Sequence, residues 1–202
     1  AWACLTLSVM RPVSLGERIP ITKEARNLIL AIDLSGSMHE MDFVLNNRPI
    51  DRLSIAKKLS KEFIKKRKGD RVGTVVFGTD AHLFIPLTFD TDTADELLDE
   101  LDFSLVNGKT AIGDAIGVSL KSFKDIKSES SVLILLSDGT ANAGVLTNEE
   151  ATSIAKKMGV KIYTVGIGAE KMAVASLFGR TEYINPSYDM DEEALKKIAA
   201  ET

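Results

Sequence analysis

The chain has 202 residues, which is enough for one domain with a well-filled core. Hydrophobic residues make up 45% and charged residues 27%, and the net charge of −4 disfavours a nucleic-acid-binding protein. A single cysteine excludes an internal disulfide and a cysteine-based zinc site, and two histidines are too few for a histidine-rich metal centre.

The chain begins with an apolar run. Residues 1–10 are apolar and are followed by Arg11-Pro12. Ten residues are about half of the ~20 that a membrane-spanning helix needs. We interpret residues 1–12 as the end of a membrane segment, with a packed N-terminal arm as the alternative. Residues 13–26 then form a linker, and residues 27–202 form the folded domain.

Strands and helices are expected to alternate along this domain. The run 28–32 is short and continuously apolar, which predicts a strand buried on both faces. A polar loop is expected over residues 39–49. Further strands are expected at 71–77, 81–85 (antiparallel, ending before Pro86), 132–136, 161–165 and near 182–184. Helices are expected at about 51–66, from Thr93, over 112–123, after Thr147, as a short piece within 170–188, and from Asp189.

Two of the predicted helices carry a capping box, in which a hydroxyl side chain is followed three residues later by a glutamate. The pairs are Thr93 with Glu96 and Thr147 with Glu150. The alternation of elements predicts an α/β fold: a doubly wound, Rossmann-like, mostly parallel sheet with one short antiparallel edge strand and helices on both faces.

Oxygen-bearing side chains follow two of the predicted buried strands. Asp33 ends the first strand and precedes Ser35 and Ser37, while Asp138 ends the most apolar strand and Thr110 lies in a loop before a helix. Ligands of open α/β sheets bind at the carboxyl ends of the strands. Two carboxylates and three hydroxyls suit a hard divalent cation such as Mg²⁺, with Mn²⁺ or Ca²⁺ as alternatives. We therefore expect these five residues to form a metal site.

Several enzymatic interpretations fail on the motifs. The Gly108-Lys109-Thr110 run resembles the end of a phosphate-binding loop, but Phe103 stands where that loop needs glycine. Asp33 stands where a nucleophile elbow around Ser35 would need glycine. Two alternatives stay open: a metal-dependent phosphotransfer enzyme that uses Asp33 as nucleophile, and a structural scaffold with an unused site.

The combination of Asp33-Leu34-Ser35-Gly36-Ser37, Thr110 and Ser137-Asp138-Gly139 resembles the metal-ion-dependent adhesion site of von Willebrand factor A (vWA) domains. The resemblance covers residues 27 to 200. More narrowly, three segments resemble the bacterial BatA/BatB branch, which also has apolar membrane segments before the domain. These segments are residues 46–53, 108–117 and 161–168.

The resemblance implies a non-enzymatic protein-interaction domain whose Mg²⁺ is completed by a Glu or Asp of a protein partner. It also implies association with MoxR-type AAA+ ATPases or other Bat proteins in stress tolerance. The expected location is the bacterial inner membrane, through flanking segments, with the domain in the periplasm. Lys109 would weaken cation binding if it pointed inward and would favour an acidic partner if it pointed outward.

Overall fold

The fold was determined as a computed structural model that describes residues 25–45, 48–106, 108–124, 126, 130–139, 141–169, 172–175, 181–185 and 190–202. The predicted membrane segment and most of the predicted linker lie outside these residues. None of the helices in the described part is long and apolar enough to cross a membrane.

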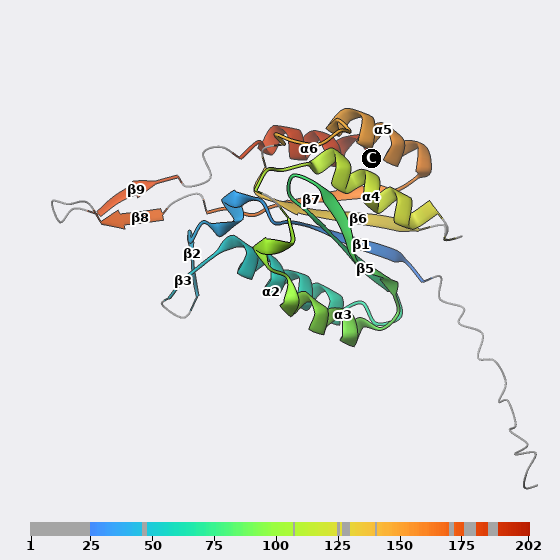
Figure 1. The fold of residues 1–202 in the computed structure, drawn as a ribbon, viewed down its shortest axis with the longest axis horizontal. Helices are drawn as coiled ribbons and strands as arrows, with labels where there is room; N and C mark the ends of the chain where they lie inside the picture. The colour runs from blue at the N-terminus through green and yellow to red at the C-terminus, as the bar shows by residue number, and fades with distance from the viewer. Residues whose placement is uncertain are drawn as a thin grey trace, which may run out of the picture.

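A five-stranded sheet forms the centre of the molecule (Figure 1), with the strand order β5-β4-β1-β6-β7. Its strands are β1 (Asn27–Asp33), β4 (Arg71–Phe77), β5 (Ala81–Thr88), β6 (Ser131–Ser137) and β7 (Lys161–Gly166). All neighbours are parallel except β4 and β5. The predicted mostly parallel sheet with one antiparallel edge strand is therefore confirmed.

Helices cover both faces of the sheet. They are α2 (Arg52–Lys65), α3 (Thr91–Leu97), α4 (Ile112–Lys124), α5 (Asn148–Met158) and α6 (Glu192–Glu201), with short 3-10 helices η1 (Gly36–His39), η2 (Leu98–Glu100) and η3 (Phe103–Leu105). Figure 1 shows α4, α5 and α6 on one face and α2 and α3 on the other. Residues 28–32 of β1 contribute to the cores on both faces and are all buried, as the continuous apolar run predicts.

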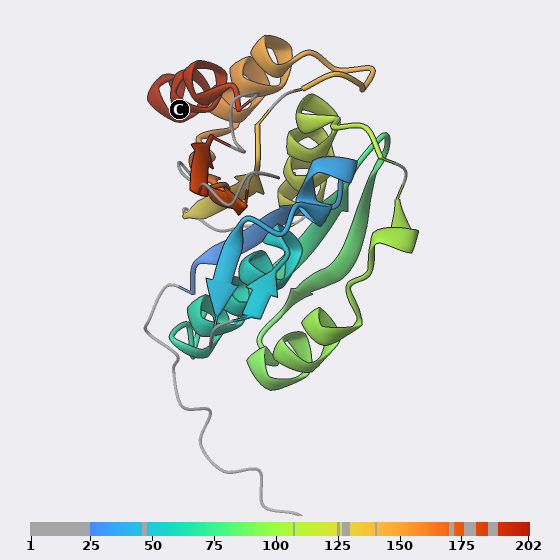
Figure 2. The same cartoon turned by 90° about the vertical axis from the view of Figure 1, so that its left-hand side faces the viewer.

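Two hairpins stand apart from the central sheet. One pairs β2 (Phe43–Leu45) with β3 (Arg48–Ile50), and the other pairs β8 (Met172–Ala175) with β9 (Thr181–Ile184). Figure 2 looks onto the end of the molecule where both hairpins lie. The predicted polar loop over 39–49 is wrong for residues 43–45 and 48–49, because β2 and β3 are three residues each, pair only with each other and carry no periodic signal. The strand predicted near 182–184 is confirmed as part of β9. The short helix predicted within 170–188 is not found at 172–175 or 181–184, which are strands, and most of its other positions lie outside the described residues.

Three predicted boundaries also need correction. The β5 strand continues through Pro86 to Thr88, which an edge strand tolerates because one side of its backbone needs no partner. Helix α3 begins after Asp90, whose carboxylate accepts a hydrogen bond from the Thr93 N–H, so Thr93 is not its cap. Helix α6 has Asp191 as its N-cap rather than starting at Asp189. The capping box of Thr147 and Glu150 is confirmed.

Candidate metal centre

The pairing register of β1 and β6 brings the ends of two strands together. Ile32 is paired with Leu136, so Asp33 and Ser137 lie side by side at the carboxyl edge of the sheet. The Ser137 hydroxyl donates a 2.6 Å hydrogen bond to Asp33 Oδ2 and accepts one of 3.1 Å from the Gly139 N–H. Ser137 thus orients the Asp33 carboxylate from the neighbouring strand.

The loop after β1 folds back over the same carboxylate. The Ser35 N–H donates to Asp33 Oδ1 over 2.8 Å, and the hydroxyl oxygens of Ser35 and Ser37 lie 3.1 Å apart. Asp33 and Ser35 are buried, whereas Ser37 is exposed. The three predicted ligands of this loop therefore occupy one small region, with an open side at Ser37.

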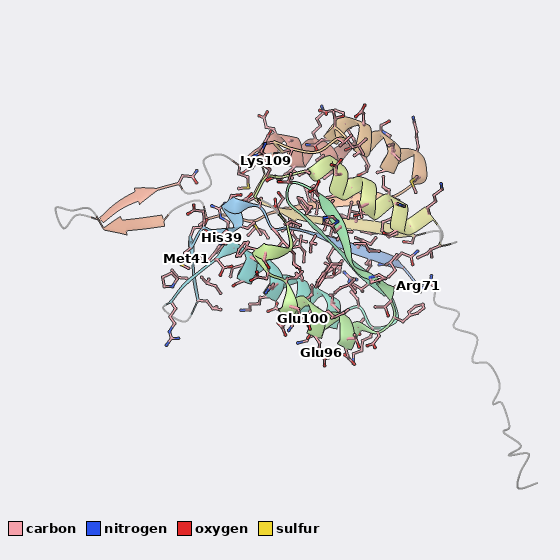
Figure 3. All side chains as sticks on the ribbon, in the orientation of Figure 1. His39, Met41, Arg71, Glu96, Glu100 and Lys109 are labelled. Atoms are coloured by element: carbon pink, nitrogen blue, oxygen red, sulfur yellow. The ribbon has the colours of Figure 1, made fainter. Side chains whose placement is uncertain are left out.

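Thr110 is held beside this loop by the backbone. The Gly36 N–H donates to the Gly108 carbonyl over 3.1 Å, which ties the two loops together. The Asn142 side chain accepts a 2.9 Å hydrogen bond from the Thr110 N–H, and the Asn142 N–H donates back to the Thr110 carbonyl over 3.0 Å. Thr110 is buried as a result. Lys109, labelled in Figure 3, is exposed. Of the two directions considered for this side chain, the structure therefore shows the outward one.

Asp138 follows β6 directly and is paired with a buried cation. The Arg52 guanidinium donates from Nη1 to Asp138 Oδ2 over 2.9 Å. The same guanidinium donates from Nε and Nη2 to Asp42 Oδ2 over 2.9 and 2.8 Å. All three side chains are buried, so Asp138 has one carboxylate oxygen committed to this ion pair.

Burial raises the pKa of Asp33 to about 7. Desolvation is the largest cause and the negative charge of Asp138 adds to it, while the hydrogen bonds from Ser137 and Ser35 oppose it. Without a cation nearby, Asp33 is therefore protonated up to near-neutral pH, and a bound cation would stabilise its ionised form. All five candidate side chains also offer hard oxygen atoms. For both reasons the residues present fit a hard divalent cation.

Within the described ranges, no three His, Cys, Asp or Glu side chains gather closely enough to hold a metal. The candidate centre instead combines Asp33 and Asp138 with hydroxyls of Ser35, Ser37 and Thr110. The structure brings the Asp33 loop, the Thr110 loop and the end of β6 to one edge of the sheet, which is where the sequence predicts them.

Sequence reasoning missed three residues that shape this centre. Ser137 could have been noticed from its place at the end of a buried strand beside Asp138. Arg52 could have been noticed because a cation in the first turn of a helix opposes the helix dipole and needs a specific partner. Asn142 gave no signal, since its contact with Thr110 spans 32 residues of sequence.

The family model of the von Willebrand factor type A domain matches residues 28–140, which contain the whole candidate centre. The chain belongs to this family. The match extends over strands β1, β4, β5 and β6 of this vWA domain and ends just after Asp138.

Similar structures come from bacterial proteins. BatB from Bacteroides thetaiotaomicron is 26% identical with a TM-score of 0.71, and the alignment covers 88% of this chain and 86% of that one. An aerotolerance-related membrane protein from Bacteroides fragilis is 24% identical with the same TM-score of 0.71, covering 88% of both chains. This vWA domain therefore shares its fold with Bat-type proteins.

One sequence relative is longer than this chain. An uncharacterised protein of Borreliella burgdorferi is 28% identical over 145 residues, which are 72% of this chain and 41% of that protein. The chain thus spans about two fifths of the length of this relative.

A more distant vWA structure contains a metal. This structure is proximal thread matrix protein 1 from the mussel byssus, with zinc in its metal-ion-dependent adhesion site (MIDAS) motif. It is 24% identical with a TM-score of 0.60, and the alignment covers 72% of this chain and 36% of that one. A metal at this motif is therefore found in at least one protein that shares this fold.

Proposed function

We propose that this vWA domain holds a divalent cation, Mg²⁺ foremost, and presents it to a carboxylate of a protein partner. The ligands would be Asp33, Ser35, Ser37, Thr110 and Asp138. The observation that carries the proposal is that the loop after β1, the loop before α4 and the end of β6 meet at the carboxyl edge of the sheet around the buried Asp33. When bound, the cation supplies an electrophilic centre for an incoming Glu or Asp.

The buried charges around the centre support a divalent rather than a monovalent ion. Asp33, Asp42 and Asp138 contribute three negative charges when ionised, and Arg52 contributes one positive charge, which leaves a sum of −2. A divalent cation would bring this buried group to neutrality. Neutral hydroxyls complete the donor set, so the ion would keep the electrophilic character that attracts a further carboxylate.

A binding role is favoured over the phosphotransfer alternative. The Asp33 carboxylate is fully buried and each of its oxygens already accepts a hydrogen bond, from Ser35 and Ser137. A nucleophilic oxygen must reach the phosphorus of a bulky phosphoryl group, whereas a small cation can be held by a second lone pair of the same oxygen or through a water molecule. A phosphatase assay with Mg²⁺ separates the two functions, because the binding role predicts no turnover.

The setting of this function is proposed by analogy with the Bat-type neighbours, one of which is described as a membrane protein. In that setting the domain is anchored to the bacterial inner membrane and faces the periplasm. Its partners would be other Bat proteins or a MoxR-type AAA+ ATPase. The exposure of Lys109 beside the centre supports an acidic partner.

Capture of partners from a membrane extract, with Mg²⁺ or with EDTA, tests the proposal. Asp33→Ala and Ser35→Ala should abolish Mg²⁺-dependent capture while circular dichroism shows a retained fold. Glu96→Ala, which removes an exposed carboxylate on α3 (Figure 3), is the matched control. Capture by the Asp33 and Ser35 variants in EDTA, equal to that of the wild type in Mg²⁺, would refute the metal bridge.

Calorimetric titration with Mg²⁺ and Mn²⁺ tests the scaffold alternative. The proposed function requires binding that disappears in Asp33→Ala. Absence of any binding at millimolar Mg²⁺ would favour an unused site.

A further inference from the structure

A buried bridge of three charged side chains connects the candidate metal centre to the β2–β3 hairpin. Arg52 contacts Asp138 of the centre on one side and Asp42 on the other. Asp42 immediately precedes β2, and its Oδ2 also accepts a 3.0 Å hydrogen bond from the Ala169 N–H after β7. The bridge therefore joins the ends of β6 and β7 to the start of the hairpin.

Stability alone does not account for this bridge. Buried ion pairs have desolvation costs that often cancel their attraction, and apolar replacements are commonly as stable. Asp42 Oδ1 is also buried with no hydrogen-bond partner among the described residues, which adds to the cost. Such an arrangement is best explained by the geometry that it imposes: one position of the hairpin relative to the centre.

The segment that the bridge holds carries exposed apolar side chains. Met41 is 58% and Val44 72% exposed, on either side of the buried Asp42. Met41 lies two residues and Val44 five residues after the end of η1, whose Ser37 belongs to the candidate centre. Figure 3 shows Met41 at the same end of the molecule as His39 and Lys109.

We propose that the Asp138–Arg52–Asp42 bridge fixes Met41 and Val44 beside the metal centre, so that cation and hairpin form one docking surface for a protein segment with a carboxylate next to apolar side chains. This inference rests on the proposed function. Arg52 acts in it as a positioning residue that contacts no partner itself.

Charge complementarity identifies this occupant. The bound cation and the exposed Lys109 would attract an acidic residue, and Arg52 is already neutralised by buried carboxylates. Met41 and Val44 would bury apolar surface only if apolar residues flank that acid. An acidic segment without apolar neighbours would leave both side chains in water.

Panning a random-peptide phage library against the whole 202-residue chain, in Mg²⁺ and in EDTA, tests the inference. Peptides enriched only in Mg²⁺ should carry Asp or Glu next to an aliphatic or aromatic residue. Val44→Asp should weaken binding of an enriched peptide about tenfold, which corresponds to the loss of one buried aliphatic side chain. Its Mn²⁺ affinity by calorimetry should be unchanged, because Val44 is not a ligand.

Two further variants complete the test. Met158→Asp introduces the same charge at an exposed apolar position on α5, so its peptide affinity should change by no more than about twofold. Asp42→Asn keeps the side-chain shape but weakens the bridge. It should therefore speed amide hydrogen exchange in residues 43–45 and lower peptide affinity.

The possible failures are distinguishable. Peptides enriched equally in EDTA would overturn the proposed function itself. Mg²⁺-dependent peptides with an acid but no apolar neighbour, or equal affinities for Val44→Asp and Met158→Asp, would overturn the docking surface alone. Wild-type peptide affinity and hydrogen exchange in Asp42→Asn would overturn the role of the bridge.

Discussion

At the residue scale, burial changes the ionisation of Asp33. Its carboxylate lies among apolar strands with two hydrogen bonds, and its pKa is raised to about 7. In an unfolded chain the same group has a pKa of about 3.9. The folded protein therefore favours the protonated form of Asp33 over a wide pH range, and the proposed cation would have to displace that proton.

The first prediction concerns the pH dependence of metal binding. Because binding needs the ionised Asp33, the affinity for Mn²⁺ should rise about tenfold per pH unit up to about pH 7 and then level off. Calorimetric titration between pH 5.5 and 8.5 measures it. Equal affinities at pH 6 and pH 8 would show that Asp33 is not the controlling group.

The second prediction concerns Ser137, which donates to Asp33. Ser137→Ala removes a hydrogen bond that lowers the Asp33 pKa, so the levelling of metal affinity should move to higher pH. It also leaves the Gly139 N–H without its acceptor, at a cost of about 1–3 kcal/mol in unfolding free energy. Ser122→Ala, which removes a helix-surface hydroxyl, should leave the pH profile unchanged.

At the element scale, α4 is placed by a close backbone approach. It starts just after Thr110, and a Cβ atom on Gly113 would lie only 2.0 Å from the Leu146 carbonyl oxygen. Asp114 accepts hydrogen bonds from the Val145 and Leu146 N–H groups in the same contact. The segment before α5 therefore fits against α4 only where residue 113 has no side chain.

The third prediction follows from this contact. Gly113→Ala should lower the free energy of unfolding by about 1–3 kcal/mol, because backbone rather than a flexible side chain must move. Gly117→Ala is the matched control in the same helix, since its Cβ would meet only the Leu146 side chain at 3.3 Å. That variant should be nearly neutral or slightly stabilised by alanine's helix propensity. Urea denaturation compares them, and equal stabilities would contradict the packing argument.

At the scale of the whole molecule, the sheet order gathers all the proposed ligands at one edge. β1 lies in the centre between β4 and β6, so the loops after β1 and β6 are neighbours. The centre therefore joins segments more than 100 residues apart in sequence. A cation bound there would stabilise the folded state as a whole, because the unfolded chain cannot assemble the site.

The fourth prediction concerns this global stability. The thermal midpoint should rise with the logarithm of the Mg²⁺ concentration. At a Mg²⁺ concentration one hundred times the dissociation constant, binding adds about 2.7 kcal/mol to the free energy of unfolding. In EDTA, the raised Asp33 pKa adds stability that is complete below about pH 4 and is lost as pH rises through about 7. Mg²⁺ should therefore raise the midpoint more at pH 8 than at pH 5.5.

Asp33→Asn is the control for this experiment, since an amide neither ionises at these pH values nor balances the charge of the cation. Mg²⁺ should not shift the thermal midpoint of this variant, and the part of the pH dependence that comes from Asp33 should be missing. A response equal to that of the wild type would place the stabilising ion elsewhere.

The sequence by itself determined the strands and the mostly parallel class of the central sheet, the approximate positions of its helices, and the candidate ligands of this protein. Continuous apolar runs such as residues 28–32 and helical spacing are local signals, and so is an aspartate at a strand end followed by Ser-x-Ser. Short strands such as β2 and β3 have no such signal, because they depend on each other for pairing.

Only the tertiary structure decided how the centre is supported. The contacts of Ser137 with Asp33, of Asn142 with Thr110, and of Arg52 with Asp42 and Asp138 are set by strand register and by the packing of α2. Ser137 and Asp33 are 104 positions apart in sequence, and Arg52 and Asp138 are 86 apart. Asn142 and Thr110 are 32 apart. No local pattern can encode such contacts, since their energies depend on desolvation that exists only in the assembled fold.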